Sequence, residues 1–335
     1  MAAACSQTLP EALRQQLKQI NSATSLAAVM ELDSRIADIF AAAAGSLIHA
    51  AGISAGDVAA IGSHGQTVWH SPVSEPPWTL QIGDPNRIAL QTGITTVADL
   101  RRMDMAAGGQ GAPLAPIFHA AMFRGEHTRV VLNLGGIANI TVLPGNAAQP
   151  VSGFDTGPAN TLLDAWAWRY LQTPCDRGGA WAAGGSVIPA LLKKLLADPY
   201  FRQPPPKSTG PEYFSLGWLG TSLEEDHAPA DVQATLVRLT AETVAAAVRD
   251  HAAGAREVIA CGGGIHNPVL MAALAECLAP VTLTTTADYG LVPDRIEALC
   301  LAWLARERLA GRPGNIPAVT GAVRPVILGA IYSPD

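Results

Sequence analysis

Charged residues, and lysines above all, are scarce in this chain of 335 residues. Charged side chains make up 15% of the sequence and hydrophobic ones 49%, a balance that excludes a disordered chain and a coiled coil. The net charge is −6 and no basic run occurs, which excludes a nucleic-acid partner because phosphate binding needs clustered Lys and Arg. No window contains about 18 consecutive large apolar residues, so we expect no membrane span and no membrane partner.

The cysteines exclude two further kinds of site. There are five of them, an odd number, and no two have the CxxC spacing of zinc sites and redox motifs. The chain also begins without a basic segment followed by an apolar one, so no secretory signal is predicted. We therefore expect reduced thiols, no metal-ligating residues and a cytoplasmic location.

The order of predicted elements indicates an α/β fold with two domains. The length alone suggests about two domains at roughly 150 residues each. Residues 9–53 have helical periodicity, and from residue 58 short apolar runs broken by glycine indicate strands. The second half alternates strands with helices, including predicted helices over 186–197 and 231–250, which favours sheets covered by helices.

Glycines follow the predicted strands, although the familiar nucleotide-binding motifs are absent. Neither GxxxxGK[ST] nor GxGxxG at Rossmann spacing occurs. The Gly135-Gly136 pair fits an ordinary tight turn, or it lets backbone N–H groups approach a phosphate because no Cβ intervenes. The Gly262–Gly264 run fits a loop packed on a neighbouring strand, or a bare surface for a base or ribose. Asn267 is the expected cap of the helix that follows.

Several polar side chains have both a functional and a structural interpretation. Asp155 ends a predicted strand, where a carboxylate faces the ligand crevice of α/β proteins, or it forms an Asx turn or cap before the next helix. Asp99 either supports catalysis or forms an ion pair with its neighbours. His64 is a polar contact to a substrate or a structural histidine. Glu297 either favours the start of the last long helix or points into the cleft.

Together, the glycine segments in this order resemble the actin, sugar-kinase and heat-shock chaperone ATPase superfamily. Longer motifs resemble one family more closely, and they are GSHGQTVWH, QIGDPNRIA, VADLRRMDMAAGGQGAPLAP, NLGGIANIT, GFDTGPANTLLDAW, DRGGAWAAGG, PPKSTGPEYF, CGGGIHN and PGNIPAVTGA. From about residue 58 to the carboxyl end the chain is similar to anhydro-N-acetylmuramic acid kinases. The resemblance implies a two-domain actin-like ATPase (ribonuclease H-like) fold with mixed sheets, flanking helices and a central cleft. It implies domains over 1–125 and 126–335, the second of which binds nucleotide.

The resemblance also implies a reaction and its cofactors, ATP and Mg²⁺. The family phosphorylates O6 of 1,6-anhydro-N-acetylmuramic acid while water opens the anhydro ring, which gives N-acetylmuramic acid 6-phosphate in peptidoglycan recycling. Asp155 matches the catalytic aspartate that takes a proton from the water, and Glu297 matches a second acidic residue near the sugar. The implied sugar-side residues are His64, Gln66, Asp99, Arg101 and Arg102. The implied nucleotide-side residues are Asn133, Gly135, Gly136, Asn139, Gly262, Gly263, Gly264 and Asn267. The family also tends to form homodimers.

One element of the family pattern has no counterpart in these 335 residues. A strand, a Gly-Ser-Thr-rich phosphate loop and a returning strand normally open the chain in this family. We therefore expect either a start farther upstream or a truncated protein. A truncated homologue that binds anhydro sugar or nucleotide without turnover is the alternative function. A chaperone- or actin-like ATPase is a second alternative, although the sugar-side segments GSHGQT and VADLRR would have no role there.

Overall fold

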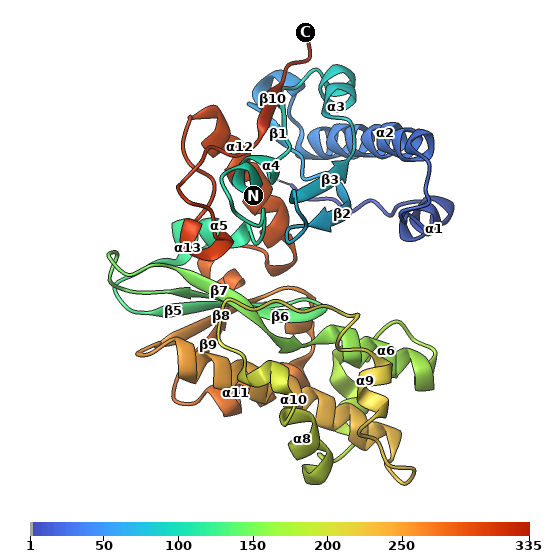
Figure 1. Cartoon of the computed structure of the whole chain (residues 1–335), viewed down its shortest axis with the longest axis vertical. Helices are drawn as coiled ribbons and strands as arrows, with labels where there is room; N and C mark the ends of the chain where they lie inside the picture. The colour runs from blue at the N-terminus through green and yellow to red at the C-terminus, as the bar shows by residue number, and fades with distance from the viewer. Residues whose placement is uncertain (1–2) are drawn as a thin grey trace. The chain divides into compact units, whose positions relative to one another are not determined.

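The computed structural model describes residues 3–335, which form two compact units (Figure 1). The first unit comprises the described residues through Phe118 together with Glu297–Asp335, and the second comprises His119–Ile296. The domain boundary at residue 125 stays a prediction, while residues 297–335 pack with the amino-terminal unit. Within residues 3–335, no helix is both long and apolar enough to cross a bilayer.

Short strands and several helices make up the first unit. Its strands are β1 (Ile61–Gly62), β2 (Gln66–Ser71), β3 (Trp78–Ile82), β4 (Thr96–Ala98) and β10 (Ala330–Tyr332). Its helices are α1 (Glu11–Lys18), α2 (Leu26–Ala51), α3 (Pro85–Thr92), α4 (Arg102–Ala106), most of α12 (Ile296–Leu309), and α13 (Pro317–Thr320). Strand β4 is parallel to β1 on one side and antiparallel to β10 on the other. Strands β2 and β3 form a separate antiparallel hairpin.

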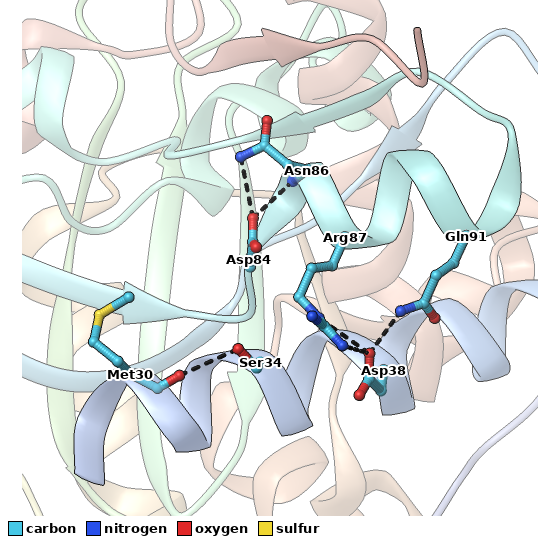
Figure 2. A network of polar contacts seen from close by, with 7 residues as sticks. All are labelled: Met30, Ser34, Asp38, Asp84, Asn86, Arg87 and Gln91. Carbon is cyan, nitrogen blue, oxygen red and sulfur yellow. Dashed lines mark hydrogen bonds and ion pairs between the residues drawn. The ribbon is translucent and has the colours of Figure 1, made fainter. Parts of the chain in front are cut away.

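Helix α2 stabilises this unit through an apolar face and a polar one. Its fully buried Ile36 belongs to a small core with Leu13, Leu32 and Ile82. On the polar side, the Asp38 carboxylate accepts hydrogen bonds from Arg87 at 2.8 Å and from Gln91 at 2.6 Å (Figure 2). Both donors lie on α3, so α2 and α3 are joined by side chains as well as by apolar packing. The predicted helical region 9–53 is therefore confirmed as α1 and α2.

The second unit contains a five-stranded mixed sheet. Its strands are β5 (Arg129–Leu134), β6 (Ile137–Leu143), β7 (Ser152–Pro158), β8 (Glu257–Cys261) and β9 (Thr282–Thr285). They lie in the order β7-β6-β5-β8-β9, and only β6 runs antiparallel to the others. This order, in which a three-strand meander is followed by two parallel strands, is that of the ribonuclease H-like fold and confirms the predicted fold class.

Helices cover one face of this sheet. They are α6 (Asn160–Leu171), α7 (Ala180–Ala183), α8 (Pro189–Leu196), α9 (Leu216–Gly220), α10 (Pro229–His251) and α11 (Pro268–Leu278), and α5 (Ala115–Phe123) crosses from the first unit into the second. Helix α10 is buried along most of its length and lies beside α11 below the sheet (Figure 1). The core joins these helices to alternate sheet residues such as Val130, Leu132 and Ile140. The predicted helices over 186–197 and 231–250 are confirmed as α8 and α10.

A buried carboxylate connects distant segments of the first unit. Asp104 is fully buried in α4, and its oxygens accept three hydrogen bonds: from the Gly111 N–H at 2.8 Å, from Asn315 Nδ2 at 2.6 Å and from Thr320 Oγ1 at 2.7 Å. The donors come from the glycine-rich loop after α4 and from the carboxyl-terminal segment. A buried carboxylate is stable only when its oxygens are paired in this way. Asp104 therefore organises the loop that follows it.

We predict that Asp104→Ala destabilises the protein by about 2–4 kcal/mol, because three buried donors lose their acceptor. Chemical denaturation of the purified variant measures this loss. The exposed Asp226 provides the control, since Asp226→Ala should change the free energy of unfolding by less than about 0.5 kcal/mol. Equal stability of the two variants would contradict the structural role of Asp104.

Candidate active site

The predicted nucleotide-side residues lie at one edge of the five-stranded sheet. Strands β5, β7 and β8 are parallel, and their carboxyl ends lead into the segments that hold these residues. Asn133 of β5 is paired with Asn139 of β6, and Asn139 is paired with Asp155 of β7. Paired residues share a face of a sheet, so the three side chains form a polar row across three strands. The carboxyl edge of parallel strands is where α/β proteins bind ligands.

Asp155 lies within β7, not at its end as predicted. The strand continues to Pro158, and α6 begins only at Asn160 after Ala159, which makes no side-chain cap. The strand is longer than expected because its pairing with β6 extends through Pro158. The position of Asp155 therefore excludes the interpretation that its carboxylate caps α6.

Backbone and side-chain contacts fix the Asp155 carboxylate in place. Its Oδ2 accepts a hydrogen bond from the Thr209 N–H at 2.9 Å, and its own N–H donates to the Lys207 carbonyl at 3.2 Å. The Tyr200 hydroxyl donates to the Asp155 carbonyl at 2.8 Å. Among the residues that the structure describes, none donates a hydrogen bond to Oδ1. Burial raises the pKa of Asp155, an effect that the Thr209 N–H opposes.

The segment that holds Asp155 is the Pro- and aromatic-rich stretch 198–218. The Lys207 ammonium donates to the Tyr200 carbonyl at 3.0 Å and lies 4.6 Å from the centre of the Tyr200 ring, a cation–π distance. Phe214 is fully buried and packs edge-to-face against Tyr200. Sequence analysis did not identify Tyr200 or Lys207 as site residues. The available signal was the motif PPKSTGPEYF, whose lysine is one of only four in the chain.

The Gly135-Gly136 turn is bound to the start of α6. The Gly135 carbonyl accepts hydrogen bonds from the N–H and the Nδ2 of Asn160, and the Gly136 carbonyl accepts from the N–H groups of Ala159 and Thr161. A Cβ on Gly136 would lie 2.5 Å from Thr161 Oγ1, whereas one on Gly135 would make only ordinary contacts. Gly136 is therefore required for packing against Thr161, whereas the space beside Gly135 would accommodate a side chain.

The Gly262–Gly264 run lies directly against the end of β5. Gly262 has a φ of +83°, and a Cβ there would lie 2.5 Å from Asn133 Oδ1. A Cβ on Gly264 would lie 2.6 Å from the Leu134 Cβ. A Cβ on Gly263 meets nothing within 4 Å. The two interpretations offered by the sequence thus apply to different residues, because Gly262 and Gly264 provide close packing while Gly263 exposes bare backbone.

Gly263 lines a cavity of about 310 Å³ in the second unit. The other lining residues are Asn160, Leu163, Asp164, Cys175, Asp176, Arg177, Gly178, His266 and Asn267. Asn267 was predicted to cap the next helix, and its Oδ1 does accept hydrogen bonds from the N–H groups of Val269 and Leu270. This cavity brings together Gly263 and Asn267 of the predicted nucleotide-side residues.

In the first unit, His64 and Arg101 form a pair. His64 Nδ1 lies 2.8 Å from the Gly65 carbonyl, and its Nε2 accepts hydrogen bonds from the Arg101 guanidinium at 3.0 and 2.8 Å. The carbonyl is an acceptor, so Nδ1 carries the proton and the ring is neutral. Burial and the arginine both lower the pKa of His64. Arg101 also donates to the Gly111 carbonyl at 2.6 Å, the loop residue whose N–H is bound by Asp104.

Arg101 is a half-buried cation that forms no ion pair with any described residue. Burial lowers its pKa, while Cys300 and Glu297 are near enough to oppose this. Within residues 3–335, no carboxylate oxygen lies within 4.0 Å of its guanidinium nitrogens, in contrast to Arg102, which pairs with Asp99 at 3.6 Å. Arg101 is thus available to an anionic ligand.

Of the remaining sugar-side candidates, Arg102 and Glu297 are exposed, while Asp99 and Gln66 are half-buried. The contact of Arg102 with Asp99 supports the ion-pair interpretation of Asp99. Asp99 has a φ of +57°, an uncommon backbone conformation for a residue other than glycine. Gln66 opens β2 and donates to the Thr67 carbonyl at 3.1 Å. Glu297 is exposed in the first turn of α12, where a carboxylate favours the helix dipole.

Comparison with known proteins assigns the chain to a family. Residues 1–334 match the family of anhydro-N-acetylmuramic acid kinases. The chain is 55% identical over 306 residues to the anhydro-N-acetylmuramic acid kinase of Xanthomonas campestris, covering 90% of this chain and 80% of that protein. It is 49% identical over 328 residues to the enzyme of that name from Coxiella burnetii, covering 97% and 88%. These similarities define a carbohydrate kinase.

The chain belongs to the anhydro-N-acetylmuramic acid kinase family. Similarity to solved structures is much weaker. Component A of the (R)-2-hydroxyglutaryl-CoA dehydratase of Acidaminococcus fermentans is 15% identical, with a TM-score of 0.41 over 81% of this chain and 84% of that one. A likeness of this size supports no argument about the site.

We predict that Gly264→Ala destabilises the protein by about 1–3 kcal/mol, the usual effect of overpacking, because its Cβ would overlap Leu134. Gly263→Ala is the matched control and should change the stability by less than about 0.5 kcal/mol. Thermal or denaturant unfolding of the two variants in the absence of ligand measures the difference. If both variants are equally stable, Gly264 does not mediate the close packing described here.

Proposed function

We propose that this protein phosphorylates O6 of 1,6-anhydro-N-acetylmuramic acid with ATP while water opens the anhydro ring, giving N-acetylmuramic acid 6-phosphate in peptidoglycan recycling. Membership of the family supports the reaction. The observation in this chain that best supports the chemistry is the Asp155 carboxylate, which is half-buried, held on Oδ2 and unbonded on Oδ1 among the described residues.

Asp155 is proposed to act as the general base. The water oxygen bonds to C1 of the sugar as the C1–O6 bond breaks, and one water proton moves to Asp155. O6 bonds to the γ-phosphorus as the bond from that phosphorus to the β,γ-bridging oxygen breaks, and ADP leaves. A carboxylate whose pKa is raised by burial is a stronger base than an exposed one. The Thr209 N–H orients Oδ2, which leaves Oδ1 to accept the proton.

Arg101 is proposed to bind the carboxylate of the sugar's lactyl group. A half-buried arginine without an acidic partner among the described residues is a strong candidate for binding a carboxylate, because the pair neutralises both charges. The Nε2 of His64 accepts from two nitrogens of the Arg101 guanidinium. Because the imidazole stays neutral, it does not compete with the sugar carboxylate for the charge of Arg101. His64 is thus a positioning residue in this proposal, and Glu297 remains the predicted second acidic residue near the sugar.

The cavity lined by Gly263 is proposed to hold the nucleoside part of ATP. The Gly135-Gly136 turn and the polar row of Asn133, Asn139 and Asp155 lie at the same edge of the sheet, toward the expected phosphates. Mg²⁺ prefers oxygen ligands and usually arrives bound to phosphates, and the amide oxygen of Asn139 suits it. When bound, Mg²⁺ neutralises charge on the transferring phosphoryl group.

The decisive experiment is turnover of 1,6-anhydro-N-acetylmuramic acid with Mg²⁺ and ATP, followed by mass spectrometry of the sugar. We expect a product heavier by one phosphoryl group and one water. Calorimetry with sugar and with nucleotide accompanies the assay. Sugar binding without any turnover would reject the kinase proposal and favour the non-catalytic homologue. The cytoplasmic location and the homodimer remain predictions.

We predict that Asp155→Asn lowers kcat by at least about 100-fold, the low end for loss of a general base. The amide can still accept from the Thr209 N–H, so sugar and nucleotide affinity should stay within about threefold. The exposed Asp250 of α10 provides the control, and Asp250→Asn should keep the wild-type rate. A near-normal rate for Asp155→Asn would show that another group accepts the proton.

The raised pKa of Asp155 adds a pH signature. The base must be ionised, so kcat/KM should fall as the pH decreases through the pKa of Asp155. Because burial raises this pKa, the fall should begin at a higher pH than for an exposed carboxylate.

A further inference from the structure

Asp164 differs from the other polar residues that line the cavity. It lies on α6, one turn after Asn160, and is half-buried. No residue that the structure describes donates a hydrogen bond to its carboxylate, and none forms an ion pair with it. Burial raises its pKa to about 6. A half-buried carboxylate without donors is costly unless something else supplies them.

The neighbouring polar groups are already engaged. Both oxygens of Asp176 accept backbone hydrogen bonds at 2.9 Å, from Trp181 and Ala182. Asn160 donates through Nδ2 to the carbonyls of Leu134 and Gly135. The Asn267 oxygen caps α11, and His266 pairs with Asp294 at 2.8 Å. Of the two carboxylates in the lining, Asp164 is therefore the one whose oxygens accept no hydrogen bond from the described residues.

Two glycines give this cavity bare backbone walls. A Cβ on Gly263 or on Gly178 would meet nothing within 4 Å, and both residues line the cavity from different segments. A flat ring or a ribose can approach backbone closely at such positions. Bare backbone and an unpaired carboxylate suit a neutral group that carries hydrogen-bond donors, and the one arginine of the lining, Arg177, is exposed.

We propose that Asp164 recognises the nucleoside by accepting hydrogen bonds from its donor groups, which are the ribose hydroxyls or the exocyclic amino group of the base. The proposal rests on the proposed function only in taking an adenine nucleotide as the occupant of the cavity. It makes Asp164 a specificity-determining residue for the nucleotide, separate from the proton transfer assigned to Asp155.

The test is calorimetric binding of three diphosphates, ADP, 2′-deoxy-ADP and inosine diphosphate, to the wild-type chain and to Asp164→Ala. Inosine diphosphate lacks the exocyclic amino group of adenine, and 2′-deoxy-ADP lacks one ribose hydroxyl. We expect Asp164→Ala to bind ADP about 10- to 100-fold more weakly, the range for a hydrogen bond to a charged group. Asp250→Ala, outside the cavity, should bind ADP like wild type.

The analogues identify the donor. If Asp164 binds the ribose, the wild-type chain prefers ADP over 2′-deoxy-ADP and Asp164→Ala loses that preference. If Asp164 binds the base, the wild-type chain prefers ADP over inosine diphosphate, and Asp164→Ala loses that preference. Both results support the proposal. Wild-type ADP affinity in Asp164→Ala, or unchanged preferences against both analogues, overturns it. Absence of ADP binding by the wild-type chain would instead reject the proposed function.

A second variant, Asp164→Asn, keeps the side-chain size and tests the charge. The ratio of its ADP dissociation constant to that of the wild-type chain should shrink as the pH falls from about 7.5 to about 5, because the Asp164 carboxylate becomes protonated through a pKa of about 6. Asp176, Arg177, Cys175 and His266 also line the cavity, but they are common to both proteins and cancel in the ratio. A ratio that stays constant with pH contradicts a role for the ionised carboxylate.

Discussion

The close approach of the Gly262–Gly264 run to the end of β5 is the contact on which the proposed nucleotide site depends. Without side chains at Gly262 and Gly264, the loop after β8 lies within van der Waals contact of Asn133 and Leu134. The same contact sets the position of the Gly135-Gly136 turn, because that turn continues directly from β5. It also places Gly263 at the cavity, because its neighbours Gly262 and Gly264 are both packed against the end of β5. One packing constraint therefore positions both glycine segments of the candidate site.

The carboxylate proposed as the general base depends on a different segment. Asp155 is part of the sheet, but its orientation comes from the stretch that contains Tyr200, Lys207 and Thr209, which lies more than 40 residues farther along the chain. A rigid strand supplies the position of the carboxylate, and backbone groups of an irregular segment supply its orientation. Such a division is common where a reactive group must be held without being neutralised. It explains why a long segment with little regular structure is rich in aromatic residues, since Phe214 and its neighbours anchor it in the core.

Much of this architecture could be predicted from the sequence, because the motifs occur where strands end. The patterns used are local ones: glycine pairs, a strand that ends near an aspartate, and an asparagine cap. The structure confirms the cap of Asn267, the fold class and the main helices. The pairing of His64 with Arg101 was not predictable, although both were candidates, because it joins residues 37 positions apart. Asp164 and Asp104 were missed for a related reason. Each is an ordinary helical aspartate in sequence, and only its tertiary surroundings show that one lacks donors while the other has three. The separate roles of Gly262, Gly263 and Gly264 likewise depend on which neighbour faces each one.

Gly263 is proposed to serve the ligand, whereas Gly262 and Gly264 serve the packing. The most direct measurement is ADP binding by Gly263→Val, combined with its unfolding in the absence of ligand. A valine side chain there meets no protein atom within 4 Å of its Cβ position, but it projects from the wall of the nucleotide cavity. Our account predicts wild-type stability, within about 0.5 kcal/mol, together with at least about tenfold weaker ADP binding. Wild-type ADP affinity in a stable Gly263→Val variant would contradict the account.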